Sequence, residues 1–509
     1  MTGAVAAGHP LTSGAAAEML SLGGNAFDAA VSAGFASVAA EPALTSLGGG
    51  GFLLAHIREQ NEDILFDFFV DAPGLNADRD IKPVMTPVDI KFPGHTQVFH
   101  TGFASAAVPG MLKGLLHVHK RLCRLPLATV VAPAISCLEK GVEVCETQGT
   151  ILSMLEPVFT STEYGRSIFI KNGRYIRQGD RLFNPLMKES LQGIAQGSFD
   201  LYQGETARMF IEEINNHHGT MTLDDLRAYK VMERKPVRFR YRNREVITNP
   251  APSTGGILLA LALGLLEQTD LPSMPRDSAH VVITLIEAMK EIASFNPLKN
   301  SAPPGFPFAG PVMAGLIESF RKNTAEKTFT ATLGTTHISI IDSDGNAASM
   351  TTSNGSGSGC FMPGTGIMLN NMMGEDDLHP EGFFSSPSGQ RVSSMMMPAM
   401  VMKDGSVESV LGSGGSKRIK TAMLQVLINL IDFHLPVKDA VERARVHYED
   451  GVVHTEPGIE EDVIGGLRKV YPVNPWRQKN MYFGGVNCVS STMQGMGDRR
   501  RGGSFLAVR

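Results

Sequence analysis

Apolar and polar positions alternate along the chain with periods that indicate a mixture of helices and strands. Apolar residues recur at helical spacing in 15–22 and 26–38, and shorter apolar runs at 52–57 and 64–70 indicate strands. The segment from 148 to 229 is predicted to be mainly helical. Because each apolar face must be buried against another layer, we expect an α+β chain with two sheets between layers of helices.

A β-hairpin is predicted around residue 344. Apolar residues at 338–341 and a second run at 346–353 flank an Asp-Gly pair at 344–345, which is a strong hairpin signal. Thr335 and Ser353 are equally far from the turn, since 344 − 335 equals 353 − 344. Antiparallel pairing would therefore place these two hydroxyl-bearing residues opposite each other.

Thr335 opens the first strand of this hairpin, within the sequence Gly334-Thr335-Thr336-His337. Cleavage of the chain before Thr335 would leave a new α-amino group beside the threonine hydroxyl. Such a group titrates near ~8, so much of it is neutral at physiological pH and can act as the base for a hydroxyl nucleophile. The alternative is an ordinary strand start, because threonine is favoured in strands.

A second hairpin is predicted from apolar runs at 400–402 and 407–411, which flank Lys-Asp-Gly-Ser at 403–406. Its open end carries two pairs of small residues, Ser393-Ser394 and Gly414-Gly415. A helical pattern at 423–431 follows the glycines, and backbone N–H groups at a helix start attract an oxyanion or a carboxylate. The alternatives are a flexible turn for the glycines and a solvated loop for the serines.

Several further motifs occur in a fixed order along nearly the whole chain. They include Gly8-His9-Pro10-Leu11, the Gly23–Ala30 segment, Gly48–Phe52, Val108-Pro109-Gly110, Met221–Leu226, Pro250–Gly256, Glu287–Lys290, Gly364–Ile367, Leu369-Asn370-Asn371 and Gly412–Ser416. Together with Thr335-Thr336-His337 and Ser393-Ser394-Met395, they make the chain resemble the γ-glutamyltranspeptidases of the N-terminal-nucleophile hydrolase superfamily. This resemblance implies a four-layer αββα sandwich.

The resemblance also implies a precursor that cleaves itself between Gly334 and Thr335. The products would be a large subunit, residues 1–334, and a small subunit, residues 335–509, which remain associated as one structural domain. The Thr335 hydroxyl would then attack the γ-glutamyl amide of a donor such as glutathione, and the acyl group would pass to water or to an amino acid or peptide. This chemistry requires no cofactor and no metal.

Individual site residues follow from the motif matches. Ser353 matches a family threonine that hydrogen-bonds the nucleophile, so the hydroxyl is retained. Gly414 and Gly415 match the pair of residues that form the oxyanion hole. Ser393 and Ser394 match the hydroxyls that hold the α-carboxylate of the donor.

Other positions depart from the family pattern. Phe69 stands where the family has an arginine that clamps the α-carboxylate, and such charge-assisted bonds contribute roughly 1.5–3 kcal/mol each. Met372 replaces a polar contact to the α-amino group, and Glu375 replaces an aspartate but can still hold an ammonium. Gly355 replaces an asparagine, whose hydrogen bond the adjacent Asn354 could take over. These changes predict a less polar pocket.

Three functions are compatible with this pattern. The first is an autoprocessed γ-glutamyltransferase or hydrolase that acts on glutathione and its conjugates. The second is an amidase with the same Thr335 mechanism and a different acyl group, as in the cephalosporin and glutaryl acylases, which Phe69 and Met372 favour. The third is an unprocessed scaffold without enzymatic activity.

Composition agrees with a large enzyme, since 43% of the 509 residues are hydrophobic and 19% are charged. A net charge of −5 argues against a nucleic-acid partner, and no apolar run reaches the ~18 residues of a membrane span. The expected partners are a small-molecule substrate and the two subunits themselves, with homo-oligomerisation left open.

Cysteine usage and the start of the chain favour a cytoplasmic protein. The five cysteines are an odd, sparse set without the spacing of metal ligands, which suits reduced thiols. No basic-then-apolar leader precedes the first motif, although a start assigned too late would hide one. The basic clusters at 417–420 and 499–501 are interpreted as solvated faces, and His337 is expected to support its strand rather than titrate.

Overall fold

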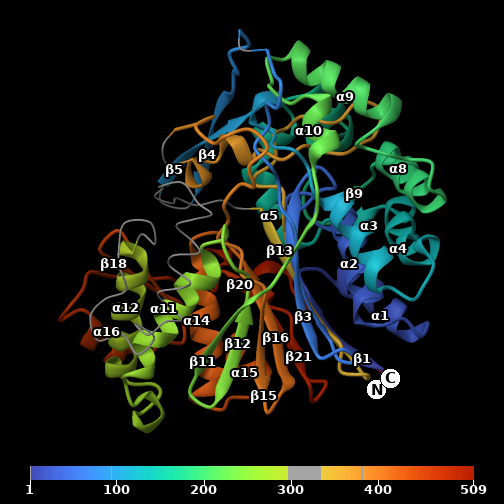
Figure 1. Cartoon of the computed structure of the whole chain (residues 1–509). Helices are drawn as coiled ribbons and strands as arrows, with labels where there is room; N and C mark the ends of the chain where they lie inside the picture. The colour runs from blue at the N-terminus through green and yellow to red at the C-terminus, as the bar shows by residue number, and fades with distance from the viewer. Residues whose placement is uncertain (1, 79, 93–94, 296–333, 380–381) are drawn as a thin grey trace.

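Two β-sheets lie face to face at the centre of the molecule, with helices outside each of them (Figure 1). The computed structural model describes residues 2–78, 80–92, 95–295, 334–379 and 382–509. Side chains of facing strands join the sheets. Ser349 Oγ donates to the Leu411 carbonyl at 3.1 Å, and the Asn487 amide donates to the His337 carbonyl at 2.6 Å.

The first sheet has seven antiparallel strands in the described part of the chain. In spatial order they are β10 (Met232–Arg234), β3 (Glu62–Phe68), β2 (Gly50–Ile57), β14 (Ala347–Ser353), β13 (Thr335–Asp342), β1 (Gly3–Ala7) and β22 (Ser504–Val508). Strands from both sides of the Gly334–Thr335 junction are therefore interleaved. The predicted hairpin at 344–345 is confirmed as β13–β14, with Thr335 paired to Ser353.

The second sheet contains the other predicted hairpin. Its strands, in spatial order, are β11 (Val237–Tyr241), β12 (Arg244–Thr248), β15 (Ala399–Lys403), β16 (Ser406–Gly414), β20 (Gly485–Ser490) and β21 (Gly495–Met496). β15 and β16 form the hairpin around the Asp404-Gly405 turn. A smaller sheet, β17 (Val446–Glu449), β18 (Val452–Thr455) and β19 (Val473–Pro475), lies beside this layer.

Helices cover the outer faces of both sheets. Those against the first sheet are α1 (Pro10–Ser21), α2 (Ala26–Ala40) and α3 (Met111–Leu122), with α4 (Leu127–Lys140) packed on α2. Those against the second are α11 (Gly255–Glu267), α14 (Arg418–Ile431) and α15 (Val437–Glu442), with α12 (Ala279–Ser294) packed on α11 and α16 (Glu461–Leu467) on α12. The 148–229 segment is mainly helical as predicted: α5 (Glu146–Met154), α6 (Glu156–Phe159), α7 (Glu163–Phe169), α8 (Pro185–Gln196), α9 (Gly204–Asn216) and α10 (Leu223–Ala228).

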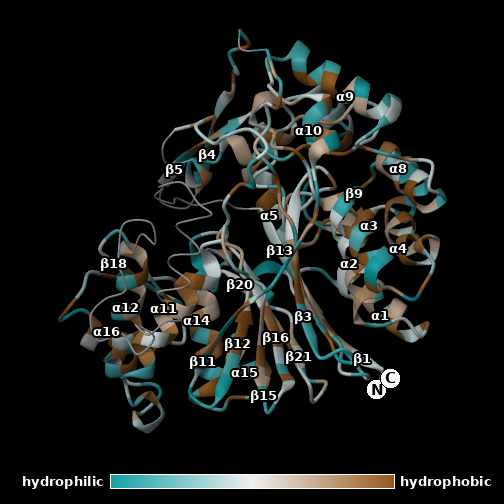
Figure 2. Cartoon of the chain, viewed as in Figure 1, coloured by the Kyte–Doolittle hydropathy of each residue, from teal (hydrophilic) through white to brown (hydrophobic). Residues whose placement is uncertain are grey.

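Side-chain alternation explains why β13 is buried on both faces. Ile338 and Ile340 pack into the cluster beneath α2, whereas His337 and Ser339 point toward the second sheet. Figure 2 shows hydrophobic residues on α11 and on strands of the second sheet, where the layers meet. β13 therefore lies where the two sheets and the α2 layer meet.

The observed element boundaries differ from the predicted ones by one or two residues at most ends, and by more at the first helix. The first helix begins at Pro10 rather than Ala15, because His9 caps it by accepting a hydrogen bond from the Leu11 N–H at 3.1 Å. The strand predicted to continue to Val70 ends at Phe68. Within the described residues, no helix combines the length and apolar character needed to cross a membrane, and all five cysteines are free thiols.

Candidate active site

Thr335 and Ser353 face each other at the open end of the β13–β14 hairpin. The Thr335 hydroxyl donates to Ser353 Oγ at 3.4 Å, and both residues are buried. The Ser353 hydroxyl in turn donates to the carbonyl oxygen of Gly334 and accepts from the Gly355 N–H at 3.1 Å. A hydroxyl therefore sits next to the peptide bond before Thr335 and polarises its carbonyl group.

The backbone around this peptide bond is too crowded for side chains. A Cβ at Gly334 would overlap the carbonyl oxygen of Gly355, and a Cβ at Gly355 would overlap the side chain of Asn371. Gly355 also has a positive φ of 63°, which favours glycine. Asn354 donates to the Leu369 carbonyl at 3.3 Å, whereas its Oδ1 is buried without a hydrogen-bond partner in the described structure.

Gly414 and Gly415 lie directly beside Thr335. A Cβ at Gly414 would overlap the carbonyl oxygen of Thr335, and Gly415, with a φ of 123°, packs against Gly484. Gly414 ends β16, and the next helix begins only at Arg418, so the two glycines form a strand end and turn rather than a helix start. This corrects the expected helix start but leaves the pair next to the nucleophile.

Arg501 is a site residue that the sequence interpretation missed. It is buried, and its Nη1 donates to the carbonyl oxygen of Thr335 at 3.1 Å. Burial lowers the pKa of Arg501 to about 10, against the opposing charge of Asp498. The prediction of a solvated basic cluster at 499–501 is therefore wrong for Arg500 and Arg501, and holds for Arg499, whose side chain is 80% exposed.

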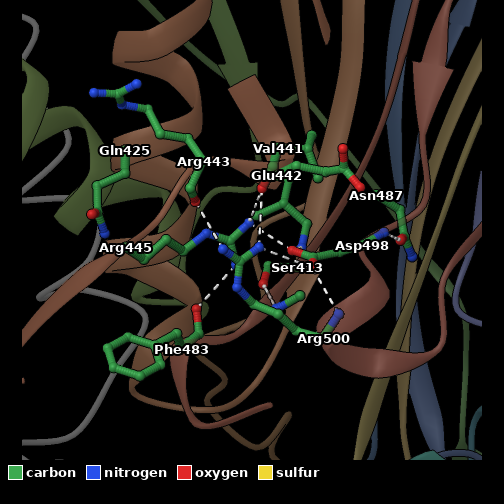
Figure 3. A network of polar contacts seen from close by, with 12 residues as sticks. Ser413, Gln425, Val441, Glu442, Arg443, Arg445, Phe483, Asn487, Asp498 and Arg500 are labelled. Carbon is green, nitrogen blue, oxygen red and sulfur yellow. Dashed lines mark hydrogen bonds and ion pairs between the residues drawn. The ribbon is translucent and has the colours of Figure 1, made fainter. Parts of the chain in front are cut away.

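A buried network of charges contacts β20, the strand paired with β16 (Figure 3). Asp498 accepts from Arg445 Nη2 at 2.6 Å and from Arg500 Nη1 at 3.1 Å, and also from the Val486 N–H at 2.9 Å. Burial alone would raise the pKa of Asp498, but the charges of Arg445 and Arg500 hold it below its usual value. Because Val486 pairs with Ser413, the residue before Gly414, the network fixes the strand next to Gly414.

A second buried carboxylate contacts the residue after the nucleophile. Glu41 accepts hydrogen bonds from Thr336 Oγ1 at 2.6 Å and from Thr12 Oγ1 at 2.7 Å. Burial raises the pKa of Glu41, and these hydrogen bonds oppose the rise. A Cβ at Gly8 would overlap both Glu41 and Thr336, which explains the glycine in the Gly8-His9-Pro10 motif.

His337 does not contact the reacting groups. Its ring nitrogens lie 2.8 Å from Thr351 Oγ1 and 2.9 Å from Ser339 Oγ, and its ring packs against Gly412. Burial lowers its pKa to about 3, so the ring is neutral near physiological pH. The structural role predicted for His337 agrees with this environment.

A small, largely apolar pocket opens beside the Thr335 hydroxyl. Its lining residues are Phe69, Thr335, Ser353, Met372, Leu378, Ser394, Met395, Met396, Ser416 and Ile419, around a cavity of about 30 Å³. A cavity of about 400 Å³ lies between α12 and α14, but Thr335 and Ser353 are not among its lining residues. We refer to the smaller cavity as the acyl pocket, because Thr335 and Ser353 line it, and its flexible methionines allow its volume to change.

Phe69 forms an apolar wall of the acyl pocket. It is buried and stacks on Phe52 at a centroid distance of 5.6 Å and an interplanar angle of 20°. Its carbonyl oxygen accepts from the Tyr229 hydroxyl at 2.6 Å and from Arg391, which also lies 3.4 Å from Asp67. Arg391 therefore lies behind the wall formed by Phe69, where it donates to the Phe69 carbonyl oxygen and does not line the pocket.

The other predicted substrate contacts are placed as follows. Ser394 lines the pocket, and its Oγ accepts from the Met396 N–H at 3.1 Å. Ser393 is buried and donates to the Pro252 carbonyl at 2.8 Å, outside the lining of the pocket. Glu375 is buried, and its Oε1 accepts from the N–H and hydroxyl of Ser356, both at 3.1 Å. Met372 is a wall residue.

Nearly the whole chain matches the model of a known protein family. The family model described as gamma-glutamyltranspeptidase matches residues 12–302 and 305–508. The chain belongs to the γ-glutamyltranspeptidase family. Among its relatives, the acylase ACY 1 proenzyme of Pseudomonas sp. (strain SE83) is 33% identical over 481 residues, covering 91% of this chain and 86% of the relative. The glutathione hydrolase proenzyme of Pseudomonas aeruginosa is 31% identical over 480 residues, covering 88% and 83%.

This member of the γ-glutamyltranspeptidase family shares its fold with a solved structure. The cephalosporin acylase from Bacillus halodurans superposes with a TM-score of 0.81 at 23% identity, covering 100% of this chain and 96% of the other. The α+β fold of the N-terminal-nucleophile hydrolase type is therefore confirmed. Family membership identifies the chain as an enzyme of this type.

Proposed function

We propose that this protein is an autoprocessed γ-glutamyltransferase or hydrolase with Thr335 as its nucleophile. In the precursor, the Thr335 hydroxyl attacks the Gly334 carbonyl carbon, an ester bond forms, and the peptide C–N bond breaks as the nitrogen takes up a proton. Water then hydrolyses the ester, which leaves a carboxylate on Gly334 and a free amine on Thr335. The hydrogen bond from Ser353 to the Gly334 carbonyl oxygen is the observation that carries this proposal.

The mature enzyme would use the same hydroxyl on a substrate amide. The Thr335 α-amine takes the hydroxyl proton, the oxygen attacks the amide carbonyl, and the N–H groups of Gly414 and Gly415 stabilise the oxyanion. The leaving amine takes the proton, and water or an acceptor amine resolves the acyl ester. Asn354 Oδ1, one residue beyond Ser353, is an acceptor that can hold the new ammonium.

A γ-glutamyl amide such as glutathione is the proposed donor. Family membership supports this assignment, as does similarity to a protein named glutathione hydrolase proenzyme. Ser394 in the pocket would donate to the α-carboxylate, and Ser393 would join it by exchanging its hydrogen bond to the Pro252 carbonyl for one to the ligand. Glu375 would hold the α-ammonium.

A second candidate is an acylase that removes a different acyl group by the same mechanism. Phe69 and Met372 favour it, because both present apolar surface where a γ-glutamyl group carries charges. The relative named acylase ACY 1 proenzyme supports the same reading.

Two measurements test these proposals. Intact mass under denaturing conditions should show two chains, the smaller beginning Thr-Thr-His-Ile, whereas a single uncut chain would refute autoprocessing. Release of nitroaniline from a γ-glutamyl anilide supports the first donor class. Turnover of a glutaryl amide without γ-glutamyl turnover would instead establish the acylase.

A further inference from the structure

Two cations lie directly beyond the wall of the acyl pocket. Ser416 lines the pocket together with Thr335, and the chain continues through Lys417 and Arg418 into α14. We call Lys417 and Arg418 the cationic turn. It begins two residues after Gly415, and the residues on either side of it, Ser416 and Ile419, both line the acyl pocket.

An aromatic wall stands against the cationic turn. The Arg418 guanidinium carbon lies 4.3 Å from the centre of the Tyr482 ring, which stacks on Trp476 at a centroid distance of 4.8 Å and an angle of 22°. His454 lies 5.2 Å from the Tyr482 ring centre. Trp476 and Tyr482 are both partly exposed. Stacked rings beside a guanidinium offer one ligand both an apolar face and a positive charge.

The aromatic wall is attached to the oxyanion glycines. Arg445 Nη1 donates to the Phe483 carbonyl at 3.1 Å, and this contact belongs to the buried network of Figure 3. A Cβ at Gly415 would lie 2.9 Å from the Cα of Gly484, so the two backbones are in close contact. The turn Met481–Phe483 is therefore held in a fixed position relative to Thr335.

The cationic turn carries more positive charge than its carboxylate partner neutralises. One oxygen of Glu449 accepts from Arg418 Nη2 at 2.8 Å and from the Tyr482 hydroxyl at 2.9 Å. Lys417 Nζ lies 3.8 Å from the other oxygen, beyond hydrogen-bond distance, and its side chain is 28% exposed. Arg418 Nε is buried and has no hydrogen-bond partner among the described residues. Burial, reinforced by the charge of Arg418, lowers the pKa of His447 well below its usual value.

We propose that the cationic turn and the Tyr482–Trp476 wall bind the amine half of the substrate and select amines that carry a carboxylate on an apolar or aromatic body. This inference rests on the proposed amide cleavage at Thr335. The acyl half occupies the pocket walled by Phe69, so the amine half must lie outside it. An acceptor amine attacks the acyl ester in the reverse of the step that releases the leaving amine. It would therefore use the same surface.

The test compares two chromogenic donors that differ by one carboxylate on the leaving amine. They are γ-glutamyl-4-nitroanilide and γ-glutamyl-3-carboxy-4-nitroanilide. Lys417→Met should lower kcat/KM for the carboxylated donor by about fivefold, mainly through KM, and change the other donor by less than about twofold. Lys403→Met is the matched control, because Lys403 lies at the turn between β15 and β16, at the end of the hairpin remote from Gly414.

Equal losses for both donors, or no loss for either, would overturn the proposed subsite. If the unmodified enzyme releases nitroaniline from neither donor, the γ-glutamyl assignment fails instead. The same pair of leaving amines is then attached to a glutaryl group and the comparison repeated.

A binding measurement tests the subsite without any turnover. Trp476 is the single tryptophan of the chain, so its fluorescence reports on the aromatic wall. The amine 5-amino-2-nitrobenzoate, added without a donor, should quench it saturably in the unmodified enzyme and more weakly in the Lys417→Met variant. Equal quenching by 4-nitroaniline, or no effect of the substitution, would contradict the proposal.

Discussion

The Arg501 guanidinium donates a hydrogen bond to the carbonyl oxygen of Thr335 at 3.1 Å, across 166 positions of sequence. The same Nη1 would lie 3.0 Å from a Cβ at Gly414, so this buried cation borders both Thr335 and Gly414. The position of Thr335 relative to Gly414 therefore depends on one side chain, that of Arg501.

Replacing Arg501 with methionine should impair both processing and turnover. The substitution removes the hydrogen bond to Thr335 and leaves buried Glu41 and Asp498 with less compensating charge. Losing one member of a buried charge network costs about 3–5 kcal/mol. We expect the appearance of two chains in intact mass spectra, and kcat, to slow by at least about tenfold.

The control for this variant is Arg499→Met, because the Arg499 side chain is 80% exposed and adjacent in sequence. It should process and turn over like the unmodified protein. Equal behaviour of the two variants would show that the Thr335 contact is unimportant.

Thr335→Ala should remain a single chain without activity, because the attacking hydroxyl is lost. Ser353→Ala should be cut more slowly, because the hydroxyl that donates to the Gly334 carbonyl is lost, and its kcat should fall by about 100-fold, because the Thr335 hydroxyl loses its hydrogen-bond partner. Mass spectrometry and an anilide assay measure both effects. A normally cleaved Thr335→Ala variant would refute the assignment of the nucleophile.

Phe69→Arg should raise γ-glutamyl turnover if the α-carboxylate binds at this wall. A charge-assisted hydrogen bond of roughly 1.5–3 kcal/mol corresponds to a gain in kcat/KM of about 10- to 100-fold. Phe69→Leu is the control for the lost stacking on Phe52 and should give no gain. If Phe69→Arg also gives none, the carboxylate is bound elsewhere.

His337 should make the protein sensitive to acid. Its pKa is about 3 in the folded protein because of burial and about 6.5 when unfolded, so the unfolded state binds the proton first. The stabilising effect of the neutral ring is complete above pH 6.5 and is lost as the pH falls toward 3. Between pH 6.5 and 5 this loss is about 2 kcal/mol.

The thermal midpoint of His337→Gln should consequently fall less between pH 7.5 and pH 5 than that of the unmodified protein. His434→Gln is a suitable control, because His434 is exposed and should leave the pH dependence unchanged. An identical pH dependence for His337→Gln would mean that the buried ring does not remain neutral.

Both hairpins were predictable from the sequence, because an Asp-Gly pair between two apolar runs specifies the turn and therefore the register. Pairing of Thr335 with Ser353 follows from that register alone. The end of β3 was not predictable, because the Phe69 carbonyl bonds to Tyr229, 160 positions away. The pattern of apolar residues around Phe69 contains no information about a hydrogen-bond partner that distant in sequence.

The sequence did not reveal which charged residues are buried. Arg500 and Arg501 belong to a run of three arginines, which is typical of a solvated face, yet Arg500 is paired with Asp498 and Glu456 inside the protein. Asp498 immediately before the run was the available signal. Glu41, in the segment that follows α2, was missed for the same reason, since its partners Thr12 and Thr336 are distant in sequence.

The order of strands in the first sheet limits how the small subunit can be made. β13 and β14 are neighbours, but β1 flanks one and β2 the other, and both flanking strands belong to residues 1–334. A fragment 335–509 synthesised alone would leave both outer edges of the β13–β14 hairpin unpaired, and unpaired strand edges promote aggregation. Recombinant production of the active form should therefore start from the uninterrupted chain rather than from two separately expressed halves.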